Sequence, residues 1–578
     1  MKCQIVRTLF LALALSTFAA CGGGSDSAPP SAAPAAAATV QPPEGVPAGT
    51  RPLPMPEPGK AYNNPQPRDN IEDGGTLTLP IASLGPNFNH LNADGNTGDV
   101  NDVTRWLRPV LWDYTPSGGV APNPDFLLAA ELLSENPETV KYTLNPNAKW
   151  NDGTPIDWTA FDATWKTQRG DDPRFNPAAT DGFRSIGSVA KGEKDNEVIV
   201  TFKEPFYPFE LVFVDIQHPK NLDPDFYKTG WVKQLHNELL AGPFIVASLT
   251  ENVLTLERNP KWWGDTAKLE RVVYRQMELA ASINAFQNGE IDATNVAIAD
   301  RLRQISGMQH VQVRRGFDMR TGVYILGRTS KFFEEEAGRK AFILGTDRRL
   351  LASIEYQGLD WAEEPPGSVL MFPWQDGYRD NIADLHYDPQ QAKAVLEAAG
   401  WKLGEDGYRR KNGVVAELTY VSFGDDPLVT ALARAQQKLS QDIGLKVNID
   451  IRKSSDFPKT LTDRSFDVLM MAFGATDPFS YATGCQLYCS DSDSNLSGFG
   501  NAEIDAMLRK PGTIANRAQA IEAANEAESA ALHLYGILPL AIGPRMTAVK
   551  EGLANSPRPA GFKFPSPEDI GWQKGTSR

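Results

Sequence analysis

The 578-residue sequence has few of the residues and motifs on which catalysis most often depends. It contains only four cysteines and six histidines, and the histidines are scattered without the spacing of a metal site. It has no Gly-x-Ser-x-Gly, no His-Glu-x-x-His and no P-loop motif. We therefore predict a protein that is not an enzyme, with no catalytic residues, no cofactor and no bound metal.

The sequence also lacks an excess of basic residues and a hydrophobic run long enough to span a bilayer. Its formal net charge of −15 argues against nucleic acid or anionic lipid as the main partner, because both require a basic surface. The N-terminal apolar run, residues 9–15, is short and follows Lys2 and Arg7. This pattern predicts a secretory signal peptide over residues 1–20.

Small residues directly before Cys21 resemble the lipobox of bacterial lipoproteins, which predicts lipidation of Cys21 and a membrane anchor. An ordinary cleaved signal is the alternative, because Phe18 stands where lipoboxes usually have Leu. Residues 21–70 are rich in Pro, Ala, Gly and Ser and cannot form a core, so we interpret them as a disordered tether or a stalk embedded in the cell wall. The expected location is the outer face of the cytoplasmic membrane, in a periplasm or cell envelope.

Two cysteines remain in the body of the protein, Cys485 and Cys489. In an exported chain such a pair favours a disulfide. A metal site is the weaker alternative, because no histidine lies nearby and a structural zinc site needs four ligands.

The most informative stretch contains Gly242-Pro243-Phe244, then Arg258-Asn259-Pro260-Lys261-Trp262-Trp263-Gly264, then Gly289-Glu290-Ile291-Asp292. Turn and breaker residues between β-rich runs predict strands over 244–248, 253–258 and 272–277 and a helix over 280–288. The identity and order of the three blocks resemble the extracellular solute-binding proteins of family 5, the oligopeptide and dipeptide receptors of ABC importers. We interpret Trp262 and Trp263 as scaffold.

The resemblance extends over about residues 71–560. It includes Trp150-Asn151-Asp152-Gly153-Thr154-Pro155, a predicted tight turn before a helix with an acidic cap at Asp157. It also includes the helix that starts at Asp388-Pro389, the helix over 428–442 and a buried strand over 466–471, which indicate α/β crossover units.

The resemblance implies an α/β, periplasmic-binding-protein-like fold with two lobes, hinge strands and an extra domain inserted in the first lobe. We expect the first lobe to comprise residues 71–321 and 539–578, with 105–233 as the extra domain. Residues 322–538 form the expected second lobe, and the ligand is expected between the lobes.

The strongest site candidates follow the predicted strand 466–471: Phe473, Gly474, Thr476, Asp477 and Tyr481. In peptide-binding members, an Asp in this position pairs with the ligand's α-ammonium group. This sequence is two residues shorter, so either Asp477 or Thr476 stands near that position. The alternative is that Asp477-Pro478 only opens a turn.

Further candidates are residues in loops, where side chains that contact ligands often lie. Trp361, Trp374 and Tyr378 are candidates to line side-chain pockets, and packing is the equal alternative. Asn89 is a first-lobe candidate, and its alternative is to cap its own loop.

The resemblance implies a lipid-anchored, monomeric receptor that captures oligopeptides or peptide-like solutes and delivers them to the permease and ATPase subunits of an ABC importer. The same fold with a non-peptide ligand, such as a metal chelate, haem, a sugar or an opine, is the first alternative. A cell-envelope hydrolase or scaffold is the second.

Overall fold

The computed structural model describes residues 62–180, 182–360, 363–424, 427–453, 456–475, 477–492, 494–555 and 562–576. The predicted signal peptide, Cys21 and the tether up to residue 61 lie outside the described residues, as do Trp361 and Thr476. In the described part, no helix is long and apolar enough to cross a membrane.

The first lobe contains a four-stranded sheet in which β1 pairs with β10 in parallel and the other pairings are antiparallel. The strands predicted around the Gly-Pro-Phe motif are confirmed, and the predicted helix is α3 (Leu279–Gln287). In sheet order the strands are β1 (Thr76–Ile81), β10 (Arg271–Gln276), β9 (Val253–Arg258) and β8 (Phe244–Leu249). Trp106 packs edge-on against Phe244 in the core of this lobe, with ring centroids 5.4 Å apart.

An antiparallel sheet with its own helix is inserted after β1 and α1 (Gly98–Thr104). Its order is β4 (Leu127–Glu135), β5 (Glu138–Leu144), β7 (Glu197–Phe202) and β6 (Ile186–Lys191). Helix α2 (Trp158–Gln168) begins at the predicted cap, because the Asp157 carboxylate accepts a hydrogen bond from the Thr159 N–H. A short hairpin, β2 (Trp112–Tyr114) and β3 (Val120–Pro122), precedes this sheet.

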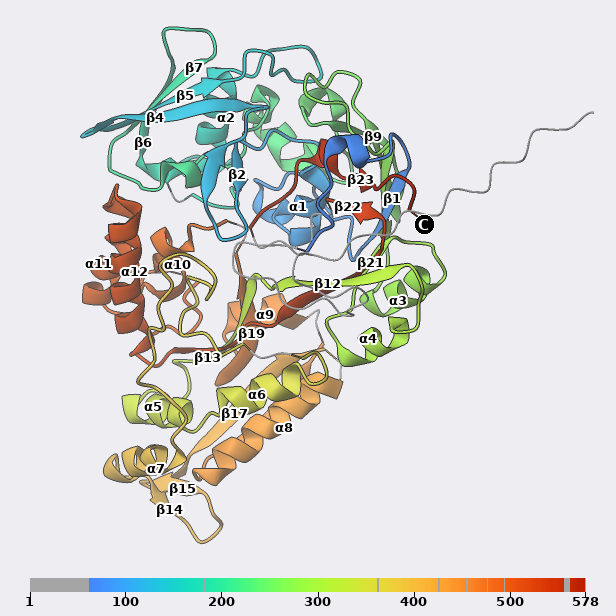
Figure 1. Cartoon of the computed structure of the whole chain (residues 1–578). Helices are drawn as coiled ribbons and strands as arrows, with labels where there is room; N and C mark the ends of the chain where they lie inside the picture. Colours follow the sequence, from blue (N-terminus) through green and yellow to red (C-terminus); the bar gives the residue numbers. More distant parts are fainter. Residues whose placement is uncertain are drawn as a thin grey trace, which may run out of the picture.

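The second lobe is built on a five-stranded mixed sheet, drawn at the lower end of the molecule in Figure 1. Its order is β18 (Lys446–Arg452), β17 (Glu417–Phe423), β19 (Val468–Gly474), β13 (Arg320–Leu326) and β20 (Ile537–Ala541). Helix α8 (Pro427–Asp442) forms the predicted crossover between the parallel strands β17 and β18. The strand predicted over 466–471 is shifted, because pairing with β13 continues as far as Gly474.

Further helices complete the second lobe. They are α5 (Glu336–Leu344), α6 (Arg348–Glu355), α7 (Pro389–Ala398), α9 (Phe457–Asp463), α10 (Cys485–Tyr488), α11 (Ala502–Arg509) and α12 (Arg517–Leu532). The structure pairs Cys485 with Cys489 in a disulfide across α10, with Cα atoms 4.6 Å apart.

Two chain segments cross between the lobes side by side. Strand β12 (Val311–Phe317) continues into β13, and β20 continues into β21 (Pro544–Lys550). Strand β21 pairs with β12 on one side and with β11 (Ala293–Asn295) on the other, while β13 and β20 pair within the second-lobe sheet. Figure 1 shows β12 and β21 lying between the lobes. The predicted lobe borders at 321/322 and 538/539 fall inside β13 and β20, and the domain division as a whole stays a prediction.

The start of the described chain is fastened to its C-terminal segment. The Asn64 amide donates to the Gln573 side chain at 3.1 Å, and the Arg68 guanidinium lies 2.6 Å from the Asp569 carboxylate. Both ends of the described chain therefore belong to the first lobe.

Asp125, just before β4, shares a hydrogen bond with Glu568 of the C-terminal segment. Burial raises the pKa of Glu568 to about 8, and the neighbouring Asp125 carboxyl adds to this rise. Between the ordinary pKa of a glutamate and about 8, the folded protein keeps the Glu568 proton that the unfolded chain has already released. The stability of the protein therefore falls as the pH rises through this range.

We expect Glu568→Gln, which resembles the neutral acid, to raise the free energy of unfolding at pH 8 by roughly 1–3 kcal/mol and to leave it nearly unchanged at pH 5. Urea denaturation at both pH values measures this. Glu270→Gln, at an exposed carboxylate of the same lobe, is the control and should change neither value. An equal effect of Glu568→Gln at both pH values would contradict the shared proton.

Candidate functional site

A large cavity opens at the carboxyl end of β19. Its volume is about 680 Å³, and Phe473 and Gly474, both predicted site residues, lie on its wall. Met471 and Phe473 are two residues apart and project to the same side of the strand. The remaining walls come from the loop after residue 368, from the end of α9 and from the segment around α10. They are Val369, Leu370, Phe372, Leu461, Thr462, Arg464, Ala475, Ser480, Thr483, Gln486, Leu487, Ser494 and Leu496.

The wall combines apolar side chains with hydroxyl and amide groups. Among the described residues that line it, Arg464 is the only one with a charged side chain. Such a surface suits a ligand that has apolar parts and also polar groups that need hydrogen bonds. Near Arg464 it favours a neutral or anionic group of the ligand.

The backbone of β19 is open along one edge of this cavity. β19 pairs with β17 only through Val468 and Leu469, whereas its pairing with β13 continues to Gly474. Within the described part of the chain, residues 470–474 therefore have no strand partner on the β17 side. An edge of this kind can accept an added extended chain.

One buried carboxylate holds the loop that forms the opposite wall. Glu528 of α12 is 1% exposed and accepts hydrogen bonds from the backbone N–H groups of Val369 (2.8 Å) and Leu370 (3.1 Å). It also accepts from the Asn381 amide at 2.8 Å and from the Tyr488 hydroxyl at 3.0 Å. Burial raises the pKa of Glu528, and these hydrogen bonds oppose the rise. Glu528 thus fixes the cavity wall from behind.

Asp477 lies next to the cavity, in the turn after β19. Its carboxylate accepts a hydrogen bond from the Phe479 N–H at 2.9 Å, so the turn-forming role considered from the sequence is present. Asp477 also lies near enough to Tyr114 of the first lobe to contribute, after burial, to the rise in that tyrosine's pKa. The Asp477 turn is therefore at the contact between the lobes.

The β2–β3 hairpin of the first lobe makes this contact. Tyr114 packs edge-on against Phe479 with ring centroids 6.1 Å apart, and Arg517 Nη2 donates to the Gly118 carbonyl at 2.9 Å. Gly118 has a φ of +96°, and a Cβ at this position would lie 2.7 Å from Pro478 Cβ. The close approach of the lobes here requires a glycine.

Tyr481, another predicted site residue, belongs to the same contact. It is 2% exposed, and the Arg517 guanidinium lies 5.9 Å from its ring. Burial raises the pKa of Tyr481 to about 12, and Arg517 opposes this rise. The phenol is therefore neutral at physiological pH.

The two other aromatic candidates that the structure describes are engaged in packing. Trp374 stacks between Phe372 and Phe317, with ring centroids 4.5 and 4.6 Å away. Because Phe317 ends β12, this stack fastens the second-lobe loop to a crossing strand. The Tyr378 hydroxyl accepts a hydrogen bond from the Gly367 N–H at 2.8 Å.

Asn89 caps its own loop, because its side-chain oxygen accepts from the Leu91 N–H at 3.2 Å. It also lines a small cavity of about 40 Å³ inside the first lobe. The structure thus gathers Phe473, Gly474, Asp477 and Tyr481 at one place and leaves Trp374, Tyr378 and Asn89 in packing or capping contacts.

Comparison with known proteins identifies the family of this chain. A family model described as bacterial extracellular solute-binding proteins, family 5, middle, matches residues 123–495, more than half of the chain. The chain belongs to this family. The predicted family resemblance is therefore confirmed.

One relative of this family 5 protein is the oligopeptide-binding protein OppA of Mycobacterium tuberculosis, which is 29% identical over 503 residues, covering 85% of this chain and 84% of the relative. Among solved structures, the periplasmic EDTA-binding protein EppA is similar with a TM-score of 0.81 and 25% identity over 87% of this chain and 98% of EppA. AppA of Bacillus subtilis, solved with a nonapeptide, has a TM-score of 0.73 and 17% identity over 87% and 100% of the two chains. These similarities confirm the predicted two-lobed α/β fold.

The family motifs did not indicate Glu528 or Arg517, which position this site. Both lie in α12, which begins 43 residues after the end of β19, and neither stands in a recognisable spacing. Only the fold brings them behind the cavity and against the hairpin.

We expect Gly118→Ala to open the lobes of this family 5 protein, because the added methyl group would overlap Pro478. Small-angle X-ray scattering should show a larger radius of gyration than for the wild type. Gly153→Ala is the matched control, since Gly153 also has a φ of +96° but no atom within 4 Å of its Cβ position. Both variants should lose about 1–2 kcal/mol of stability from the positive φ, and only Gly118→Ala should expand. Equal radii for the two variants would rule out a spacing role for Gly118.

Proposed function

We propose that the protein captures oligopeptides or peptide-like solutes between its two lobes and delivers them to the permease of an ABC importer. The observation that carries the proposal is the open edge of β19 beside a cavity of about 680 Å³ with apolar, hydroxyl and amide side chains on its wall. An extended peptide adds its backbone to such an edge and places alternate side chains in the neighbouring pocket. The similarity to proteins named for oligopeptide binding supports the same ligand class.

In this proposal, residues 470–474 of β19 pair with the peptide backbone, and Phe473 packs against one of its side chains. Asp477 and Tyr481 stand where the lobes meet, and Asp477 offers a carboxylate to the peptide's ammonium group. The remaining candidates for contact with the ligand are Thr476, Trp361, Trp374, Tyr378 and Asn89.

The proposal places the protein outside the cytoplasmic membrane, lipidated at Cys21 and acting as a monomer. The family of extracellular solute-binding proteins supports the location. No catalytic step is part of the function, and ATP hydrolysis belongs to the importer's other subunits.

A carboxylate-rich metal chelate is the second candidate. Arg464 is the one charged side chain among the described residues of the cavity wall, and it would attract an anionic ligand. The similarity to EppA, whose name gives EDTA as its ligand, favours the same class.

Native mass spectrometry of the purified mature chain, followed by mild denaturation, tests the ligand class directly. We expect released peptides, and we expect Phe473→Ala to weaken the affinity for them by about ten- to a hundredfold, since burying a Phe side chain contributes roughly 1.5–3 kcal/mol. Tyr387→Ala, at an exposed aromatic of the same lobe, is the control and should bind normally. Release of a metal chelate and no response to peptides would transfer the assignment to the second candidate.

Strand addition makes a separate prediction about the ligand backbone. N-methylation of the tightest-binding peptide at successive positions should weaken binding about tenfold at alternate residues only, because every second N–H points toward β19. Isothermal titration measures each analogue. Uniform losses, or none, would mean that the peptide does not pair with β19.

A further inference from the structure

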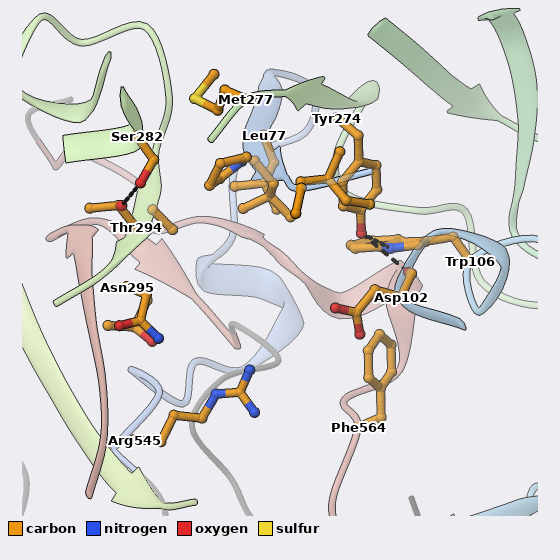
Figure 2. A pocket seen from close by; sticks show the side chains of 16 residues that line it. Leu77, Asp102, Trp106, Tyr274, Met277, Ser282, Thr294, Asn295, Arg545 and Phe564 are labelled. Carbon is orange, nitrogen blue, oxygen red and sulfur yellow. Dashed lines mark hydrogen bonds between the residues drawn. The ribbon is translucent and has the colours of Figure 1, made fainter. Parts of the chain in front are cut away.

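A second cavity lies in the first lobe and shares no lining residue with the cavity at β19. Its volume is about 250 Å³. Its walls come from the end of β1, from α1 and α3, from β10 and β11, from the crossing strand β21 and from the C-terminal segment (Figure 2). The volume is below the range of drug-sized ligand pockets, so an occupant must be small.

Two side chains of opposite charge reach this cavity from different elements. Asp102 comes from α1 and Arg545 from β21, and Figure 2 shows both projecting into the space between them. Asn295 of β11 adds an amide on the side of Arg545. A ligand with one anionic and one cationic group matches this arrangement, because each group forms charge-assisted hydrogen bonds.

The rest of the wall is mainly apolar and includes Leu79, Met277, Trp106 and Phe564, of which Trp106 and Phe564 lie beside Asp102. Phe564 packs edge-on against Trp106 with ring centroids 6.3 Å apart, and the Arg105 guanidinium lies 4.1 Å from the Phe564 ring on which it stacks. These contacts hold an apolar surface next to the charges, where an aliphatic or aromatic side chain can pack.

The wall that carries Asp102 is fixed by a chain of hydrogen bonds, drawn in Figure 2. The Trp106 indole N–H donates to the Tyr274 hydroxyl at 2.8 Å, and this hydroxyl donates to the Asp102 carbonyl at 3.2 Å. On the far side, the hydroxyls of Ser282 and Thr294 are 2.7 Å apart. The cavity is therefore formed before any ligand arrives, which lowers the entropy lost on binding.

We propose that this first-lobe cavity is a second solute site, which binds a single free amino acid with an apolar side chain. Arg545 takes the α-carboxylate, Asp102 takes the α-ammonium group, and the side chain packs against Trp106 and Phe564, which lie beside Asp102 in Figure 2. The site is independent of the cavity at β19 and does not require the proposed peptide function.

Isothermal titration of the full purified chain with L-leucine, L-methionine and L-phenylalanine tests the site. At least one should bind, and its amide and its N-acetyl derivative, which each lack one charge, should bind about tenfold or more weakly. Arg545→Gln should bind the amino acid and its amide alike, while still rejecting the N-acetyl form. Asp102→Asn should show the converse selectivity.

Three controls separate this site from the one at β19. Arg303→Gln, at an exposed arginine of the same lobe, should bind like the wild type. Phe473→Ala should leave amino-acid binding unchanged, and Arg545→Gln should leave peptide binding unchanged. If a variant fails to fold, titration of the amide and the N-acetyl derivative into the wild type still shows whether each charged group of the amino acid contributes to binding.

No binding of the three amino acids at millimolar concentration would overturn the proposal. So would binding that Phe473→Ala removes and Arg545→Gln leaves intact, since the amino acid would then occupy the second lobe. Equal affinity of the wild type for the amino acid and both derivatives would show that the charged pair plays no part.

Discussion

The pairing of the two crossing segments is the constraint on which both lobes depend. Each segment supplies one strand to the second-lobe sheet and one to the small sheet of the first lobe. Where they pass between the lobes, the Asp318 N–H donates to the Gly543 carbonyl at 3.2 Å, and a Cβ on Gly543 would lie 2.1 Å from the Tyr356 ring. The crossing is thus narrow and well packed, and neither lobe can complete its sheet without it.

Side chains extend this constraint into both lobes. Lys550 at the end of β21 forms a 2.6 Å ion pair with Asp292, whose carboxylate also accepts from the Thr78 N–H at 2.7 Å. On the other side, Phe317 at the end of β12 stacks on Trp374, which links the crossing to the loop that Glu528 holds. A continuous set of contacts therefore runs from β1 through the crossing strands to the wall of the larger cavity.

The sequence was sufficient for features that depend on neighbouring residues. Gly153 has the positive φ expected of the Asn-Asp-Gly turn, Asp157 caps its helix, and Cys485 lies within reach of Cys489. The family motifs also predicted a buried strand that corresponds to β19, and the site residues after it stay a prediction. The motifs did not indicate the extension of this strand to Gly474, because pairing with β13 joins residues about 150 positions apart.

The walls of the larger cavity could not be predicted from the sequence for the same reason. They come from β19, the loop after residue 368, the end of α9 and the segment around α10, which only the fold assembles, and no motif distinguishes Glu528 behind them. Trp374 shows the limit of reasoning from residue type. An aromatic residue in a loop with proline suits a ligand pocket and a packed stack equally well, and only the position of Phe317 decides that it is packed.

The fastening of Asn64 and Arg68 to the C-terminal segment has a mechanical consequence. Any force that arrives along the N-terminal part of the chain enters the first lobe and is shared there with Gln573 and Asp569. It does not pass through the crossing strands. Such a force would therefore load the first lobe and leave the second lobe unloaded.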